Sequence, residues 1–129
     1  MFKINKVFLL LVMIFMHILD DFVLQSVGCL AMLKQKKRWI EDKEYKPFYK
    51  YDYLVALAMH SFSWAFMIML PIAFSCDFNV SSWFAIMFCV NAIVHFIVDN
   101  LKANCGAINL VIDQTIHIIQ IVYTAVILV

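Results

Sequence analysis

Glycine and proline, the residues that end helices and form tight turns, are almost missing from this sequence: two of each stand among 129 residues. Charged residues are also scarce, at 15%, against 65% hydrophobic residues and a mean hydropathy of +0.89. A soluble domain of this length needs more polar surface than such a composition provides. The composition therefore excludes a soluble domain and predicts an integral membrane protein, too short for a second domain.

Sequence signals for disulfides, lipid anchors and secretion are missing as well. The four cysteines have no CxxC spacing, so we expect small apolar side chains rather than disulfides or metal ligands. Neither end carries a lipidation motif. Lys3 and Lys6 precede an apolar run, but the run continues through His17 and Asp21 instead of ending at a small-residue cleavage site. It is therefore predicted to remain as a first transmembrane helix.

Four long apolar segments cover residues 7–33, 53–75, 82–101 and 107–129. Each approaches the roughly 20 residues that cross about 30 Å of hydrocarbon. Because a backbone in lipid must satisfy its own hydrogen bonds, each segment is predicted to be a helix. The expected fold class is all-α, an integral membrane four-helix bundle that forms a single domain over residues 1–129, with a loop at residues 34–52.

Positive charge is concentrated in that loop. Seven of the ten Lys and Arg lie within residues 34–50, and Lys102 follows the third segment, whereas only Lys3 and Lys6 precede the first. The positive-inside rule therefore places the basic loop in the cytoplasm and both termini outside. We also expect the loop to contact anionic lipids of the bilayer. No nucleic-acid partner is predicted.

Histidine and aspartate recur four residues apart inside the apolar segments. The pairs are His17 with Asp21, His95 with Asp99, and Asp113 with His117; the remaining histidine, His60, has no such partner. A spacing of four puts both side chains on one face of a helix. At about 1.5 Å per residue, most of these groups fall at one depth, in the half of the bundle next to the basic loop. Three helices are thus predicted to direct paired imidazoles and carboxylates into one layer.

Divalent metal binding is the chemistry that this layer favours, because ionisable groups inside a bilayer persist when they are paired, wetted or bound to an ion. Zn²⁺ prefers imidazole nitrogen and carboxylate oxygen, and Mn²⁺ is a second candidate. The predicted ligands, enough for one or two ions, are His17, Asp21, His60, His95, Asp99, Asp113 and His117. The predicted supporting or capping side chains are Asp20, Gln25, Asn91, Asn100 and Gln114.

Each feature also has a purely structural interpretation. A histidine inside a bundle can serve as a hydrogen-bonded contact between helices. Lys102 can extend to the interface or bind an anionic substrate group. The tryptophans fit interface belts or packing, and no chemistry is assigned to them.

Three stretches of the sequence resemble one known family. Residues 17–25, HILDDFVLQ, are similar to its His-x-x-x-Asp-Phe-x-x-Gln opening; residues 95–102, HFIVDNLK, to its His-x-x-x-Asp-x-x-Lys stretch; and residues 113–117, DQTIH, to its Asp-Gln-x-x-His ending. The family is domain of unknown function 3307, small membrane proteins of bacteria and their phages. Asp20 beside Asp21 departs mildly from the pattern, and the spacing from His17 favours Asp21 as the carboxylate that faces the site.

The resemblance implies a bacterial inner-membrane protein close to membrane proteins labelled metal-dependent hydrolases, which are distantly similar to zinc phospholipases C and P1-type nucleases. The first hypothesis is therefore a membrane-embedded metal-dependent hydrolase of a phosphoester in a lipid or lipid-linked substrate. Asp21 and Lys102 are its candidate catalytic residues.

Two further hypotheses belong to other classes. The first is a proton or metal-ion pathway, or a membrane modulator that binds metal without turnover, since chains of Asp and His also serve relays and transporters. Transport through so narrow a bundle would require a homo-oligomer. In the other, the polar layer only fixes how the helices pack.

Overall fold

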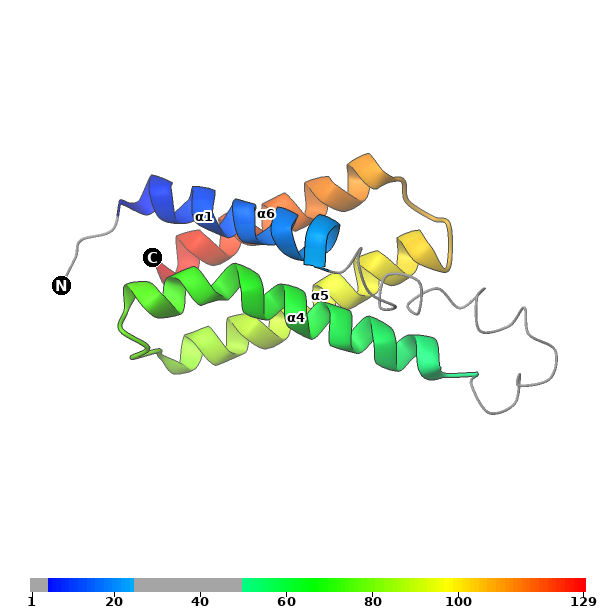
Figure 1. Cartoon of the computed structure of the whole chain (residues 1–129), viewed down its shortest axis with the longest axis horizontal. Coiled ribbons are helices and arrows are strands. Elements are labelled where there is room, and N and C mark those ends of the chain that lie inside the picture. The colour runs from blue at the N-terminus through cyan, green and yellow to red at the C-terminus, as the bar shows by residue number, and fades with distance from the viewer. Residues whose placement is uncertain (1–4, 25–49) are drawn as a thin grey trace.

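A computed structural model describes residues 5–24 and 50–129 (Figure 1). The described elements are α1 (Lys6–Ile18), continued by a π-helix η1 (Leu19–Leu24), then α4 (Asp52–Ser75), α5 (Ser82–Ala103) and α6 (Leu110–Leu128). No strand occurs in these two ranges. Four helices are long and apolar enough to cross a membrane, the first running through Leu24. The all-α four-helix class is therefore confirmed.

Helix ends follow local capping chemistry. The Asn5 side chain accepts a hydrogen bond from the Val7 backbone N–H at 2.8 Å, and the Asn109 side chain accepts one from Ile112 N–H at 2.9 Å. Both satisfy N–H groups that a first helical turn leaves unpaired.

Two predicted helix boundaries differ from those observed by more than one residue. The fourth helix begins at Leu110 rather than at residue 107, because Gly106 has a positive φ of 61° and the chain turns there before Asn109 caps α6. The third helix extends two residues further than predicted, to Ala103. Residues 25–33 of the predicted first helix, with nearly all of the basic loop, lie outside the described ranges.

The helix α4 is the central helix of the bundle. In its most apolar stretch of 18 residues, 56% of the residues are buried. The corresponding share is 22% for α1 with η1, 28% for α5 and 22% for α6. It packs against each of the other helices, and α6 also contacts α1 and α5. Large apolar side chains such as Phe8, Phe15 and Val126 are exposed on the outside, where a bilayer would cover them.

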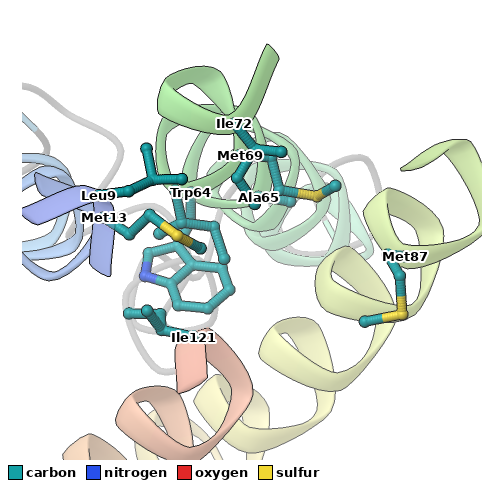
Figure 2. Close-up of a cluster of buried hydrophobic side chains, with 9 residues drawn as sticks. Leu9, Met13, Trp64, Ala65, Met69, Ile72, Met87 and Ile121 are labelled. Carbon is teal, nitrogen blue, oxygen red and sulfur yellow. The ribbon is translucent and has the colours of Figure 1, made fainter. Parts of the chain in front are cut away.

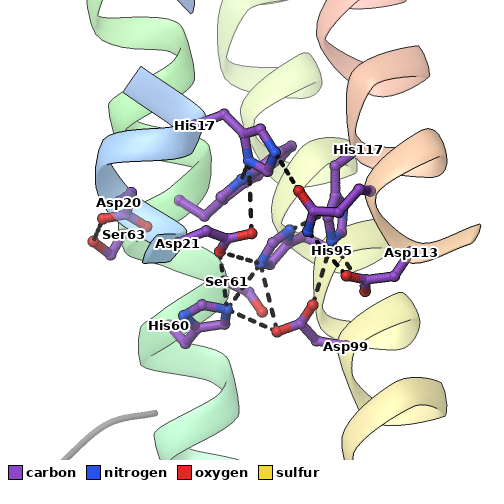
Figure 3. Close-up of polar contacts among 12 residues, drawn as sticks. His17, Asp20, Asp21, His60, Ser61, Ser63, His95, Asp99, Asp113 and His117 are labelled. Atoms are coloured by element: carbon purple, nitrogen blue, oxygen red, sulfur yellow. Dashed lines mark hydrogen bonds and ion pairs between the residues drawn. The ribbon is translucent and has the colours of Figure 1, made fainter. Parts of the chain in front are cut away.

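The bundle has an apolar half and a polar half. The apolar core contains Leu9, Met13, Trp64, Ala65, Ile68, Met69, Ile72, Met87 and Ile121 (Figure 2). This core lies toward the start of α1, the end of α6 and the α4–α5 turn. The buried histidines and aspartates lie toward the opposite end, where η1 ends, α4 begins and α5 connects to α6 (Figures 1 and 3). Trp64 stands between the two halves.

The three described cysteines, Cys76, Cys89 and Cys105, are free thiols. Cys89 and Cys105 are exposed rather than packed as interior apolar side chains.

Candidate metal centre

Seven side chains from all four helices converge in the polar half, and we call them the His/Asp centre. They are His17, Asp21, His60, His95, Asp99, Asp113 and His117 (Figure 3). All four histidines are at most 1% exposed, and Asp99 and Asp113 are 3% and 0% exposed. The side chain of Asp21 is 10% exposed. The structure thus gathers all seven predicted ligand residues in one buried cluster.

Asp21, His60 and His95 form the first group able to hold a metal ion. The Nε2 atoms of His60 and His95 lie 3.0 Å apart, and Asp21 Oδ1 lies 3.6 Å from the first and 4.0 Å from the second. Asp99 Oδ2 adds a fourth atom, 2.7 Å from His60 Nε2 and 3.8 Å from His95 Nε2. Ligands held tetrahedrally at about 2.0 to 2.2 Å from Zn²⁺ lie about 3.3 to 3.6 Å from one another. The separation of the two nitrogens, and of each carboxylate oxygen from each nitrogen, is therefore within 1 Å of that between zinc ligands.

His95, Asp99 and His117 form the second group. His117 Nε2 lies 3.3 Å from Asp99 Oδ1, and the Nδ1 atoms of His95 and His117 also lie 3.3 Å apart. Asp113 Oδ1 approaches the same His117 Nε2 at 3.5 Å. The two oxygens of Asp99 thus face different groups, Oδ2 toward His60 and Oδ1 toward His117.

Two carboxylate oxygens in this centre have no hydrogen-bond donor among the described residues. They are Asp21 Oδ1 and Asp113 Oδ1, and both are buried. A buried carboxylate oxygen without a donor costs free energy, and a bound cation removes that cost. Two imidazole nitrogens that face each other share at most one proton, so at least one of His60 Nε2 and His95 Nε2 is unprotonated, as metal ligation requires. This donor set fits a divalent cation.

His17 differs from the other histidines because both of its ring nitrogens have partners outside the two groups. The Trp64 indole N–H donates to His17 Nδ1 at 2.7 Å, and His17 Nε2 lies 3.0 Å from Gln114 Oε1. Indole N–H is only a donor and amide oxygen only an acceptor, so His17 is neutral with its proton on Nε2. The structure brings His17 within 3.7 Å of Asp21 but into neither metal group.

Asp113 is held by residues at the α5–α6 end of the centre. Its Oδ2 accepts hydrogen bonds from Lys102 Nζ at 2.6 Å and from Gln114 Nε2 at 3.0 Å. The side chain of Lys102 is 34% exposed while Asp113 is fully buried. Lys102 therefore connects the buried centre to the surface.

The π-helix η1 separates the two neighbouring aspartates. Asp20 is 1% exposed and accepts a hydrogen bond from Ser63 Oγ at 2.8 Å, whereas Asp21 points toward His60 (Figure 3). Both contacts are to α4. The wide turn of a π-helix is often found at functional sites, and here it lets consecutive carboxylates meet one neighbouring helix.

Only some of the predicted supporting residues lie at the His/Asp centre. Gln114 contacts the centre, while Asp20 bonds Ser63 beside it. Asn91 lies further along the bundle, where its amide donates to Thr124 Oγ1 at 2.8 Å. Asn100 accepts a hydrogen bond from Asn104, the residue that caps the end of α5, and Gln25 lies outside the described residues.

Sequence reasoning missed Trp64. Its ring stacks on His95 with centroids 4.2 Å apart and planes at 16°, and it is fully buried. One signal was present in the sequence: Trp64 follows His60 by four residues, the position at which aspartate follows His17 and His95.

Comparison with known proteins gives a family and nothing more. A family model described as "Protein of unknown function (DUF3307)" matches residues 8–129. No curated protein and no solved structure matches the chain.

Proposed function

Since the chain belongs to the DUF3307 family, whose function is unknown, we propose a function from its own site: a membrane-embedded, divalent-metal-dependent hydrolase. Its substrate is a phosphoester of a lipid or a lipid-linked molecule. Zn²⁺ is the expected metal, because the donors are imidazole nitrogens and carboxylate oxygens without thiolates; Mn²⁺ is the second choice.

The observation that carries this proposal is the convergence of two carboxylate oxygens, Asp21 Oδ1 and Asp99 Oδ2, on His60 Nε2 and His95 Nε2. Each oxygen lies 2.7 to 4.0 Å from the two nitrogens, which are 3.0 Å apart. These atoms come from η1, α4 and α5, so only the assembled bundle presents them. Asp21 Oδ1 is buried and lacks a donor among the described residues, and a cation there would compensate its charge.

The depth of the centre supports an amphiphilic substrate. Asp99 stands four residues before the end of α5 and Asp113 three residues after the start of α6, about 5 to 6 Å inside the helix ends at 1.5 Å per residue. His60 and His95 are each eight residues from the nearer end of α4 and α5, about 12 Å inside. Lipid phosphates lie near the ends of transmembrane helices, whereas acyl chains lie beside their apolar faces. A phosphoester of a membrane lipid would thus reach the centre without crossing the bilayer.

Each side chain has a role in this proposal. Asp21, His60, His95 and Asp99 would hold the divalent ion, which would activate water at neutral pH and polarise phosphoryl oxygens. Asp21, whose side chain is 10% exposed, would orient the attacking water or accept its proton. Lys102, partly exposed and paired with Asp113, attracts the anionic head group. Trp64 and the apolar core beyond it keep water out of the rest of the bundle.

A second candidate, a proton path, is favoured by one specific observation. His60, His95 and His117 form a row in which Nε2 faces Nε2 at 3.0 Å and Nδ1 faces Nδ1 at 3.3 Å. Such a row can pass a proton from ring to ring. The apolar core on the other side of Trp64 offers no continuation across the membrane, so the row serves local proton movement better than transport.

Metal analysis and phosphate release from one purified preparation test the proposal. The detergent-purified protein, reconstituted with zinc or manganese, is incubated with phosphorylated lipids in mixed micelles beside the isosteric variants Asp21→Asn and Asp20→Asn. We expect at least about one equivalent of metal and phosphate release in the parent. Asp21→Asn should lower both at least about tenfold, and Asp20→Asn, which keeps an acceptor for Ser63, should lower neither.

Other outcomes separate the candidates. Metal binding without hydrolysis of any phosphorylated lipid would leave the proton path or a non-enzymatic modulator, which proton flux in proteoliposomes then tests. A parent that stays metal-free after reconstitution would remove the hydrolase proposal.

A further inference from the structure

We propose that the ligand atoms around His117 could hold a second divalent ion, but that the positive charge of Lys102 keeps this second site empty. The resident stoichiometry is therefore one ion, bound at the Asp21, His60, His95 and Asp99 side. This inference rests on the metal binding proposed above and determines how many ions the centre accepts.

The second site has its own ligand atoms. Asp99 Oδ1 and Asp113 Oδ1 lie 3.3 and 3.5 Å from His117 Nε2, close to the separation of about 3.3 to 3.6 Å between zinc ligands. Asp113 is fully buried, and its Oδ1 has no donor among the described residues although Lys102 and Gln114 bond its Oδ2. One oxygen of Asp113 is thus directed inward, toward His117.

Asp99 links the two sites. Its Oδ2 lies 2.7 Å from His60 Nε2 and its Oδ1 lies 3.3 Å from His117 Nε2. A carboxylate with its oxygens on two sides is the bridge found in centres whose ions lie about 3.5 to 4 Å apart. Asp99 is therefore placed to contribute one oxygen to each site.

The net charge of the centre disfavours binding of a second ion. Metal ligation requires neutral imidazoles, so the described charged side chains of the centre are the carboxylates Asp21, Asp99 and Asp113 and the ammonium of Lys102. Asp20, although buried, is outside this count because it lies beside the centre and accepts a hydrogen bond from Ser63. Three negative charges and one positive charge leave two negative charges, which one divalent ion neutralises. A second ion would leave two positive charges in an apolar bundle, where uncompensated charge is costly.

Lys102 stands where it opposes that ion directly. Its Nζ lies 2.6 Å from Asp113 Oδ2, so a cation on the other oxygen of the same carboxylate would face the ammonium within a few ångströms. Lys102 follows Asp99 by three residues on α5 and shares its helix face. The ammonium thus compensates Asp113 in place of a metal.

The test is the metal content of Lys102 variants. Parent, Lys102→Met and Lys102→Arg proteins are purified in detergent, saturated with zinc, desalted and analysed for metal and protein. Lys102→Met keeps the length and removes the charge, whereas Lys102→Arg keeps the charge. We expect about one equivalent in the parent and in Lys102→Arg, and a doubling to about two in Lys102→Met. The double variant Lys102→Met/Asp113→Asn should return to about one.

A second readout uses Mn²⁺ in place of zinc. In Lys102→Met, two ions bridged by Asp99 should show exchange coupling in the electron paramagnetic resonance spectrum, and the parent should show an isolated ion. Lys102→Gln replaces Lys102→Met if the latter does not fold. Two equivalents in the parent, or one equivalent and an uncoupled spectrum in the folded uncharged variant, would overturn this inference and leave the proposed function intact. A metal-free parent would overturn both.

Discussion

Trp64 shows at the residue scale how one side chain separates two environments. Its indole N–H donates to His17 Nδ1 at 2.7 Å, its ring stacks on His95, and its other neighbours include Met13 and Ile121 of the apolar core (Figure 2). An indole is suited to this boundary because it combines a large apolar face with a single donor. It fixes the tautomer of His17 and the plane of His95 together.

Replacing Trp64 by Phe should therefore destabilise the protein through one hydrogen bond. The aromatic face over His95 remains, but His17 Nδ1 loses its donor inside the bundle, at a cost of about 1 to 3 kcal/mol. Unfolding of the detergent-purified protein in sodium dodecyl sulfate measures this change. The control is Trp83→Phe, because Trp83 is 62% exposed; its effect should stay within about 0.5 kcal/mol. Equal losses in the two variants would contradict the role given to Trp64.

At the scale of helices, α5 and α6 are joined by a polar cluster of Asn91, Gln120 and Thr124. The Asn91 amide donates to Thr124 Oγ1 at 2.8 Å, and the Gln120 amide donates to the Asn91 carbonyl oxygen at 3.3 Å. Gln120 Oε1 also lies 3.2 Å from His117 Nδ1. In lipid, apolar surfaces give little preference for one helix pairing, so such polar contacts select the pairing and its register. The cluster therefore sets the position of His117 relative to α5.

A double-mutant cycle on Asn91→Leu and Thr124→Val measures this contact. Each single change should cost about 1 kcal/mol, with a coupling of about 0.6 to 1.7 kcal/mol, because either one removes the same hydrogen bond. Unfolding in sodium dodecyl sulfate provides the four free energies. Metal content should not change in any variant, since neither residue belongs to a metal group. Purely additive effects would mean that the contact does not stabilise the pairing.

The whole molecule is polarised along its long axis. The start of α1, the end of α6 and the α4–α5 turn lie at the apolar end, and the His/Asp centre lies toward the end with the α5–α6 connection (Figure 1). If the positive-inside rule holds, the basic loop and the α5–α6 connection share the cytoplasmic side. The centre then lies nearer the inner leaflet, and the anionic lipids that the basic loop is expected to bind would be its neighbours.

Thiol labelling tests this orientation. In a cysteine-free background, one variant retains Cys105 in the α5–α6 connection, and another carries Asn79→Cys in the α4–α5 connection; both positions are exposed. In intact bacterial spheroplasts, a membrane-impermeant reagent should label Asn79→Cys at least about tenfold more than Cys105, because the bilayer excludes it from the cytoplasmic side. Permeabilised cells should label both. The reverse pattern would place the termini in the cytoplasm and the centre outside.

Local properties of the sequence determined the fold class and the composition of the polar layer. Runs of apolar residues of bilayer length predict helices whatever their partners, because the solvent is lipid. The four-residue spacing put Asp21 within 3.7 Å of His17 and Asp99 within 3.8 Å of His95, since helix geometry alone fixes these contacts. The same rule selected Asp21 over Asp20 as the carboxylate on the face of His17.

Only the tertiary structure decided what each of these groups touches. Gln114 meets His17 across 97 residues of sequence, and Trp64 meets it across 47, which turns a predicted ligand into a neutral, doubly hydrogen-bonded side chain. Lys102 likewise contacts Asp113 on the next helix. The spacing of residues within α5 does not predict this contact. Helix rotation and register, set by packing between segments distant in sequence, determine these contacts, and no local pattern records them.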